Sequence, residues 1–463
     1  MKRTLDTFSQ PNKENTGLFG KELSEYNFVP FDCVKLKNTE LIWYNKDIVR
    51  SLGYPCDETT EQKILDNFSY VTPDYENSEK LDLSDRKVFL ADRYGSPAEE
   101  ANGGSARCGI NGHFQIKGNG RNPLVAVNVD YGHSHGKVCL TEAVAEAIWG
   151  EICHFELPYG AVRTLAIIKT NGSILSDYGL GDMVEQPTAL IIRELAVRPA
   201  HYERATYFWP ASEFKYLRDS DHFYVKDSTL KLDAYCEDKF KGEKNPIFSY
   251  LLDAVTRMGH QIAISRVKGI PHGSLTSSNI GMDGAFLDFG TITAVPDYDN
   301  FVLTEGLGGV WDDHFPISRW LQNLFFYINK YSCYGLNEEE KKALISKFLS
   351  IREEYEDLET AKQCGLSGDD IYLKEVGKKI KEKLRENKTQ RKALYGIVRE
   401  DFISELNSVL SSLKIEKSNI DFNLRDIFYN KYTLTVDKRV AGFGGSNTDI
   451  NEMISSYVSK YWD

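Results

Sequence analysis

The sequence has few cysteines, and none of them is paired in the way that metal and redox sites require. The eight cysteines of the 463-residue chain are widely spread, and no Cys-x-x-Cys pair occurs. Structural zinc sites and thioredoxin-like dithiols depend on such closely spaced pairs. We therefore expect reduced, mostly buried thiols and neither of these two kinds of site.

Long hydrophobic runs are also missing. Residues 1–26 are polar and lack the apolar core of a signal peptide, and no stretch approaches the roughly 18 to 20 apolar residues of a membrane span. We expect a cytoplasmic protein with no membrane span.

The chain has fewer positive than negative side chains. It contains 56 Lys and Arg and 68 Asp and Glu, which gives a net charge of -12. A repulsive field of this sign argues against nucleic acid as a partner. Any phosphate-binding site must therefore be locally basic. With 41% hydrophobic and 27% charged residues, the composition is that of an ordinary folded protein.

The length of the chain exceeds what one hydrophobic core usually serves, so several packed units are expected. Glycine is dense between residues 94 and 123, and helical periodicity dominates beyond residue 210. We expect an α+β fold with a β-rich lobe followed by a helical lobe. The expected divisions are a polar arm (1–25), an N-terminal segment (26–93), a β-rich lobe (94–210), a helical lobe (211–335) and a helical C-terminal extension (336–463).

Hydrophobic spacing predicts the main elements. Leu41, Tyr44, Ile48 and Leu52 have helical spacing, and Asn337 precedes three glutamates in the manner of a helix cap. The predicted strands cover residues 113–117, 138–140, 162–168 and 189–192, and the further predicted helices run from 144 to 155 and from 246 to 262.

Residues 270–290 hold the most informative motif. Asn279 and Asp288 carry oxygen ligands of the kind that Mg²⁺ prefers. A turn at residues 282–284 predicts a hairpin that returns both side chains to the same edge, and the Asp-Gly of that turn has a backbone role. Asp288-Phe289-Gly290 resembles the metal-binding signature of protein kinases, and His272 stands seven residues before Asn279, as in the kinase catalytic loop.

The chain resembles the selenoprotein O (YdiU) family, which also has His-Gly in this loop and an Asn and an Asp nine positions apart. A second match is Gln-Ile-Lys-Gly-Asn-Gly at residues 115–120, and a third is the strand ending at Arg193. The resemblance implies a bilobal protein-kinase-like fold that uses ATP and Mg²⁺ or Mn²⁺ to transfer AMP to Ser, Thr or Tyr hydroxyls of a protein or peptide.

The resemblance also assigns the nucleotide-binding residues. Lys117 would be the phosphate-binding lysine and Glu146 its partner, although Glu142 and Glu151 lie in the same region. Two arginines would hold the terminal phosphate. Arg193 matches the first, and the second is Arg204, with Arg198 as its rival. A glycine loop containing Gly104 would bring Arg107 to the phosphates, and Gly136 belongs to the family's second Gly-rich match.

The motif departs from the family at the proposed base. Ser278 stands where the family has the Asp thought to accept the proton of the attacking hydroxyl, and serine cannot do so at neutral pH. His135 replaces a second family Asp. His133 and His135 lack a third ligand nearby, so we interpret both as loop residues.

Three functional hypotheses follow. The first is a protein adenylyltransferase that uses ATP with a metal held by Asn279 and Asp288. The second is a nucleotide-binding pseudoenzyme that acts as a scaffold or as part of a peptide- or protein-modifying complex. The third, γ-phosphoryl transfer, is disfavoured because Ser274 occupies the position of the catalytic Asp of kinases.

Overall fold

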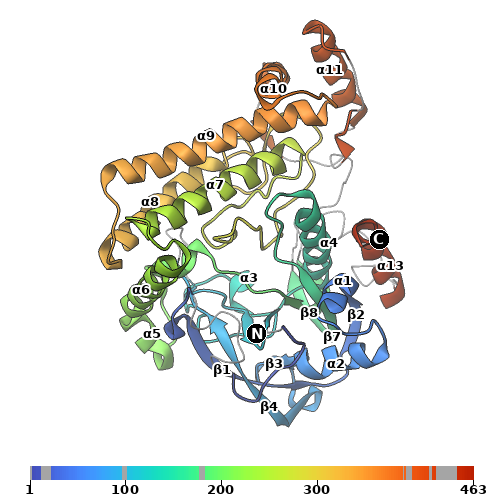
Figure 1. Cartoon of the computed structure of the whole chain (residues 1–463). Coiled ribbons are helices and arrows are strands. Elements are labelled where there is room, and N and C mark those ends of the chain that lie inside the picture. The colour runs from blue at the N-terminus through green and yellow to red at the C-terminus, as the bar shows by residue number, and fades with distance from the viewer. Residues whose placement is uncertain are drawn as a thin grey trace.

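The computed structural model combines one large antiparallel sheet with a helical region. It describes residues 3–11, 22–95, 102–176, 183–388, 390–392, 399–416, 420–423 and 446–462. The sheet occupies the lower part of Figure 1, the long helices α7, α8 and α9 the upper part, and α4 lies between them. The protein is therefore of the α+β class.

The sheet has eight strands in the order β2-β7-β8-β6-β5-β4-β1-β3, and its paired neighbours are antiparallel. The strands are β1 (Phe28–Leu36), β2 (Glu40–Tyr44), β3 (Tyr70–Val71), β4 (Leu81–Asp92), β5 (Cys108–Asn111), β6 (Phe114–Lys117), β7 (Thr164–Ser176) and β8 (Val184–Arg193). The tight turn between β5 and β6 places Lys117 at the end of a central strand. This confirms the strand predicted over residues 113–117.

Alternating side chains of β7 and β8 bury both faces of the sheet. Ile167 and Ile191 pack on α4 (Leu140–Glu156), whereas Ile168 and Ile192 pack on the opposite face with residues of α1 (Lys46–Ser51) and α2 (Glu58–Phe68). Successive side chains of a strand point to opposite faces, so a strand covered on both sides is apolar throughout. This arrangement fixes α4 directly over the strands that carry Lys117 and Arg193.

The N-terminal helix predicted over residues 41–52 is wrong in its first half. Residues 40–44 form β2, which pairs with β7, and the helix α1 begins only at Lys46. Asn45 caps it, since its Oδ1 accepts a hydrogen bond of 3.0 Å from the Ile48 amide. The apolar and aromatic residues 41–44 satisfy a helical spacing as well as a buried strand, and pairing with the sheet decides between them.

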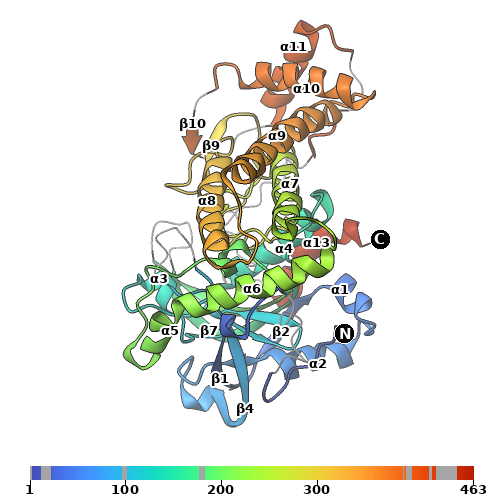
Figure 2. The ribbon, with the colours of Figure 1, turned by 60° about the vertical axis from the view of Figure 1, so that its left-hand side comes forward.

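The helical region is built around α7 (Pro246–Val267), which starts with proline in the first turn and Asn245 as its cap. This confirms the helix predicted there, and α9 starts at the predicted cap Asn337. The other elements are α5 (Lys215–Asp219), α6 (Asp221–Lys239), α8 (His314–Tyr331), α9 (Glu338–Gln363), α10 (Asp370–Arg385), α11 (Arg399–Ser412), and the short strands β9 (Asn300–Val302) and β10 (Gln390–Lys392). Figure 2 shows α10 and α11 on the side of α9 that faces away from the sheet.

Two segments far from the centre of the sequence complete the β-rich region. In the predicted N-terminal arm, Leu5 is fully buried and the Phe8 amide donates a 2.9 Å hydrogen bond to Asn111. Helix α13 (Asn447–Val458) returns to pack on α4 and β2, as Figures 1 and 2 both show. Among the described residues, no helix is long and apolar enough to cross a membrane.

Candidate functional site

Lys117 lies between two carboxylates on α4. Its Nζ is 2.7 Å from Glu146 and 2.9 Å from Glu142, and all three side chains are buried. Residues four apart share one face of a helix, so a single lysine can contact both. Arg107 pairs with the outer carboxylate, Glu142, at 2.7 Å. Burial alone would raise the pKa of Glu142, but Arg107 and Lys117 outweigh it and lower this pKa to about 2.

Glu151, the third carboxylate considered for this pair, lies elsewhere. It is fully buried against Arg163 at 2.6 Å and accepts a 2.8 Å hydrogen bond from the Trp462 indole. It therefore joins α4 to the segment that follows α13 and has no contact with Lys117. Glu142 and Glu146 contact Lys117, whereas Glu151 contacts Arg163. The positions of the three glutamates in the sequence do not show this difference.

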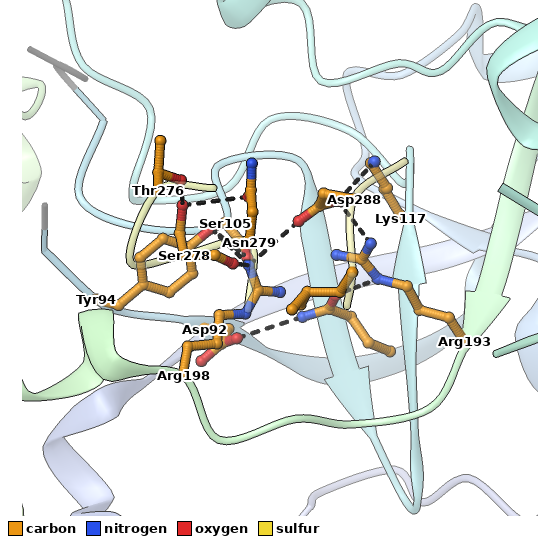
Figure 3. Close-up of polar contacts among 12 residues, drawn as sticks. Asp92, Tyr94, Ser105, Lys117, Arg193, Arg198, Thr276, Ser278, Asn279 and Asp288 are labelled. Atoms are coloured by element: carbon orange, nitrogen blue, oxygen red, sulfur yellow. Dashed lines mark hydrogen bonds and ion pairs between the residues drawn. The ribbon is translucent and has the colours of Figure 1, made fainter. Parts of the chain in front are cut away.

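The Asp288 carboxylate forms ion pairs with three cationic side chains. Its Oδ1 lies 2.8 Å from Lys117 Nζ and 2.7 Å from Arg193 NH1, and its Oδ2 lies 3.3 Å from Arg198 NH1. Figure 3 shows these side chains converging on the carboxylate from different segments. Burial would raise the pKa of Asp288, but Arg193, Lys117 and Arg198 hold it well below its ordinary value. The carboxylate is ionised at neutral pH.

The backbone around Asp288 is specialised. The residue has a φ of 63°, in the left-handed region that aspartate tolerates better than most side chains. Upstream, the predicted hairpin is present as an isolated bridge between Ile280 and Phe286, with the Gly284 amide bonded to the Gly281 carbonyl at 3.0 Å. The Asp283 carboxylate accepts the Ala285 amide, which is the backbone role expected of it. The hairpin brings Asn279 and Asp288 back to one wall of the site.

The loop at residues 272–279 is held by its own hydrogen bonds. The Asn279 Nδ2 donates to the Ser274 carbonyl at 2.9 Å, and its Oδ1 accepts the Ser278 hydroxyl at 3.3 Å. His272 Nε2 lies 2.8 Å from the Leu287 carbonyl, and burial lowers the pKa of this imidazole to about 4. The neutral His272 thus fixes the loop against the residues before Asp288, and the oxygen of Asn279 is turned toward the hydroxyl of Ser278.

Arg198 and Arg204, the two candidates for the second phosphate-binding arginine, have different partners in the structure. Arg198 contacts both Asp288 and the Ser278 carbonyl, the latter at 2.8 Å, and is buried. Arg204 pairs instead with Asp221 at the start of α6, at 2.7 Å. The structure brings Arg198 rather than Arg204 to the cluster around Asp288. The first choice made from sequence spacing, Arg204, lies apart from it.

The two predicted glycines also differ. Gly104 lines the pocket, with a φ of 141° and no room for a Cβ because the Asp92 carbonyl is only 2.3 Å from where it would lie. Gly136 has a φ of 73° and packs against the backbone of Gly120. It does not line the pocket, so its glycine identity has a packing reason.

These groups surround one cavity of about 690 Å³ between the sheet and the 272–291 loop. Its lining combines the cations Arg107, Lys117 and Arg193 with the oxygen-bearing side chains of the hairpin. The described residues that line it are Tyr94, Asn102, Gly104, Ser105, Ala106, Arg107, Cys108, Lys117, Asn128, Val129, Asp130, His133, Glu142, Arg193, Ser274, Ser278, Asn279, Asp288, Gly290 and Thr291. A cavity of this size accommodates a cofactor-sized ligand.

The side chains of Asn279 and Asp288 could hold Mg²⁺ only together with oxygens from a bound phosphate group or water. The described residues contain no cluster of three His, Cys, Asp or Glu that could hold a metal by themselves. Asn279 and Asp288 have side-chain oxygens and line the same cavity. Mg²⁺ sites commonly use one or two such side chains together with phosphate oxygens and water, so the two residues fit that kind of site.

Sequence reasoning missed the support beneath the 274–279 loop. Glu203 is fully buried and accepts a 2.6 Å hydrogen bond from Ser277 and a 3.0 Å hydrogen bond from Asn323 of α8. Burial raises its pKa to about 8. Burial therefore favours the protonated form of this carboxyl group. No local pattern marks it, because its partners are 74 and 120 residues away.

The fold and site together define an α+β protein with a pocket lined by three cationic side chains, three carboxylates and the amide of Asn279. No protein-family model matches the chain. The chain is 21% identical over 287 residues to the protein nucleotidyltransferase YdiU of Vibrio atlanticus (strain LGP32), which covers 59% of this chain. The chain spans about half of that relative's length, 52%. This distant similarity supports the resemblance to the YdiU family that the motifs indicate.

Proposed function

We propose that the protein is an ATP- and metal-dependent protein adenylyltransferase that transfers AMP to the hydroxyl of a Ser, Thr or Tyr side chain. The observation that carries the proposal is the convergence of Lys117, Arg193 and Arg198 on Asp288. Asp288 lines one cavity together with Asn279, Lys117 and Arg193. The similarity to a protein nucleotidyltransferase supports the reaction class. The acceptor class comes from the resemblance to the family.

The three cations suit a polyphosphate. Guanidinium groups match phosphate oxygens in shape as well as charge, and the buried Arg193 and Arg198 are already oriented by their neighbours. The Arg193 Nε–H donates a 2.9 Å hydrogen bond to Gln115, and the Arg198 NH1 donates a 2.8 Å hydrogen bond to the Ser278 carbonyl. Preorganised cations of this kind would grip one end of ATP and stabilise charge that develops at the transferred phosphorus.

Asp288 would exchange partners when the nucleotide binds. Its carboxylate neutralises the three cations in the structure, and phosphate oxygens would replace it there. Asp288 and Asn279 would then be available to hold Mg²⁺ or Mn²⁺. When bound, that cation would offset the charge of the phosphates.

The proposed mechanism lacks a general base at the position of Ser278. Ser278 lies beside Asn279, and its hydroxyl contacts Thr276 at 2.9 Å and Asn279 at 3.3 Å. A neutral hydroxyl in this place can orient an attacking group but cannot accept its proton at neutral pH. Positioning and charge stabilisation supply much of the rate of such reactions, so the loss slows transfer without abolishing it.

The architecture is proposed to be the bilobal kinase-like one. Strands β5 to β8 with α4 would form the N-lobe, residues 94–210, and α6 to α8 would belong to the C-lobe, residues 211–335. Residues 26–93 would be an N-terminal segment that adds β1 to β4 to the sheet, and residues 336–463 would be an extension. The Lys117–Glu146 pair between strand and helix supports this arrangement, because protein kinases use such a pair to fix the phosphate-binding lysine.

Labelled ATP tests the reaction. The protein is incubated with candidate acceptor proteins and Mn²⁺ or Mg²⁺, in parallel with α-labelled and γ-labelled ATP. Transfer of the α label alone is expected, and Asp288→Ala should abolish it. Transfer of the γ label alone would instead identify a kinase.

The alternative is a nucleotide-binding pseudoenzyme that serves as a scaffold or as part of a peptide- or protein-modifying complex. Ser278 favours it, since the group expected to act as base is missing. ATP binding without transfer of either label would support this alternative and refute the adenylyltransferase.

A further inference from the structure

A histidine and an aspartate form a dyad at the rim of the same pocket. Asp130 caps the short helix α3 (Tyr131–Ser134), and its Oδ2 lies 2.7 Å from His133 Nδ1. Its other oxygen accepts the His133 backbone amide at 3.1 Å. Asn102 donates to the His133 carbonyl at 3.4 Å, so the dyad is tied to a second segment of the pocket wall.

The dyad determines which imidazole nitrogen faces a ligand. A carboxylate at Nδ1 favours the tautomer that carries its proton there, which leaves the lone pair on Nε2. The His133 side chain is 73% exposed, so Nε2 can be reached by a substrate at the pocket. Both residues line the cavity that also contains Ser278, Asn279 and Asp288.

Several of the other charged side chains that line the cavity are poor proton acceptors at neutral pH. Arg107, Lys117 and Arg193 each pair with a carboxylate, and these cationic side chains have no lone pair with which to accept a proton. Arg107 and Lys117 outweigh the effect of burial on Glu142 and lower its pKa to about 2. An imidazole is the side chain whose intrinsic proton affinity suits a base near neutral pH.

We propose that His133, oriented by Asp130, is the general base of this protein and takes the role that Ser278 cannot perform. The inference rests on the proposed adenylyltransferase function. The acceptor's O–H proton moves to Nε2 as its oxygen forms a bond to the α-phosphorus. The bond from that phosphorus to the bridging oxygen breaks, and pyrophosphate leaves. The imidazolium then releases its proton to water.

The surroundings of the dyad are compatible with this role. The hydrogen bond from His133 overcomes the opposing effect of burial and lowers the pKa of Asp130, so its carboxylate can stabilise the imidazolium. On the following segment, His135 is close enough to Arg107, Glu142, Lys137 and His133 for each of them to act on its pKa. Arg107 and Glu142 pair with each other at 2.7 Å, so together they add little net charge to the pocket wall.

The test compares His133→Asn, Asp130→Asn and a control, His222→Asn, whose histidine lies on α6 and does not line the pocket. Transfer of the α label is measured over about pH 5 to 9, with kcat and KM for ATP determined separately. We expect His133→Asn to lower kcat by about 10²- to 10⁴-fold with KM for ATP unchanged, and to remove the loss of rate on the acid side. Added imidazole should restore part of the rate, and Asp130→Asn should have a smaller effect of the same kind.

Three results would overturn the inference. An active wild type whose His133→Asn variant keeps its kcat and pH profile refutes the role of His133 and leaves the proposed function standing. A raised KM for ATP with unchanged kcat identifies His133 as a nucleotide contact instead. A wild type that transfers no α label refutes the adenylyltransferase itself, and the base with it.

Discussion

Lys117 and Glu146 face each other across the junction of β6 and α4, with Nζ 2.7 Å from the carboxylate. The other oxygen of Glu146 lies 3.5 Å from Arg193. Glu146 therefore holds two of the three cations that also contact Asp288. A change in the position of α4 would alter these contacts through Glu146 and also through Glu142, which lies on the same helix and contacts Lys117.

We expect Glu146→Gln to weaken ATP binding by about 10- to 100-fold, because a hydrogen bond to a charged group typically contributes about 1.5–3 kcal/mol. Equilibrium dialysis with labelled ATP measures the change. Glu151→Gln is the matched control, since it alters a buried carboxylate of the same helix that contacts Arg163 and Trp462. It should lower the thermal midpoint but leave the ATP affinity of the folded protein unchanged. Equal loss of affinity in both variants would contradict the assignment.

Arg198 and Arg204 form a second matched pair. Arg198→Met removes a cation that contacts Asp288, whereas Arg204→Met removes one that pairs with Asp221. We expect the first variant to lose about 10-fold or more in ATP affinity and the second to stay within about 2-fold of the wild type. Titration calorimetry distinguishes them. A larger loss for Arg204→Met would restore the choice made from sequence spacing.

Asp288 should couple metal binding to nucleotide binding. Asp288→Asn removes the negative charge that competes with phosphate for Lys117, Arg193 and Arg198. The variant should therefore bind ATP in EDTA at least as tightly as the wild type, but should gain nothing from Mn²⁺, whereas the wild type gains about 10-fold or more. Dialysis with and without Mn²⁺ measures both affinities. An Asp288→Asn variant that gains as much from Mn²⁺ as the wild type would refute the metal assignment.

Glu203 predicts a pH dependence of stability. Burial raises its pKa from the ordinary value of 4.5 to about 8 in the folded protein, so the folded state binds the proton more tightly than the unfolded state. Its stabilising contribution is fully present below pH 4.5 and is lost as the pH rises through 8. The slope for one such proton is about 1.4 kcal/mol per pH unit within that window.

Glu203→Gln isolates this effect, because an amide can keep both contacts by accepting from Asn323 and donating to the Ser277 hydroxyl. We expect the variant to gain stability relative to the wild type as the pH rises from about 6 to about 9. Urea unfolding at both pH values measures the difference between the two proteins. A difference that does not change with pH would show that Glu203 is ionised in the folded protein.

Several features of the site could be predicted from local patterns. The hairpin between Asn279 and Asp288 depends on a turn sequence, and the start of α7 depends on Asn245 and Pro246, so each is encoded within a few residues. Lys117 follows from the strand and glycine turn around it. The roles of these residues in binding nucleotide and metal stay predictions until the experiments above are done.

Other features depended on segments far apart in the chain. Residues 41–44 could form either a helix or a strand, and the edge of β7 decided for the strand. The choice of Arg198 over Arg204 depended on Asp221 of α6, and the position of Glu151 depended on Trp462, 311 residues away.

The sequence by itself determined which chemical groups the site could contain and the turns that present them, because caps, glycine turns and strand patterns act over a few residues. Only the tertiary structure decided which charges meet. Ion pairs between distant segments depend on how the sheet, α4 and the 272–291 loop pack together, and residue spacing along the chain does not carry that information.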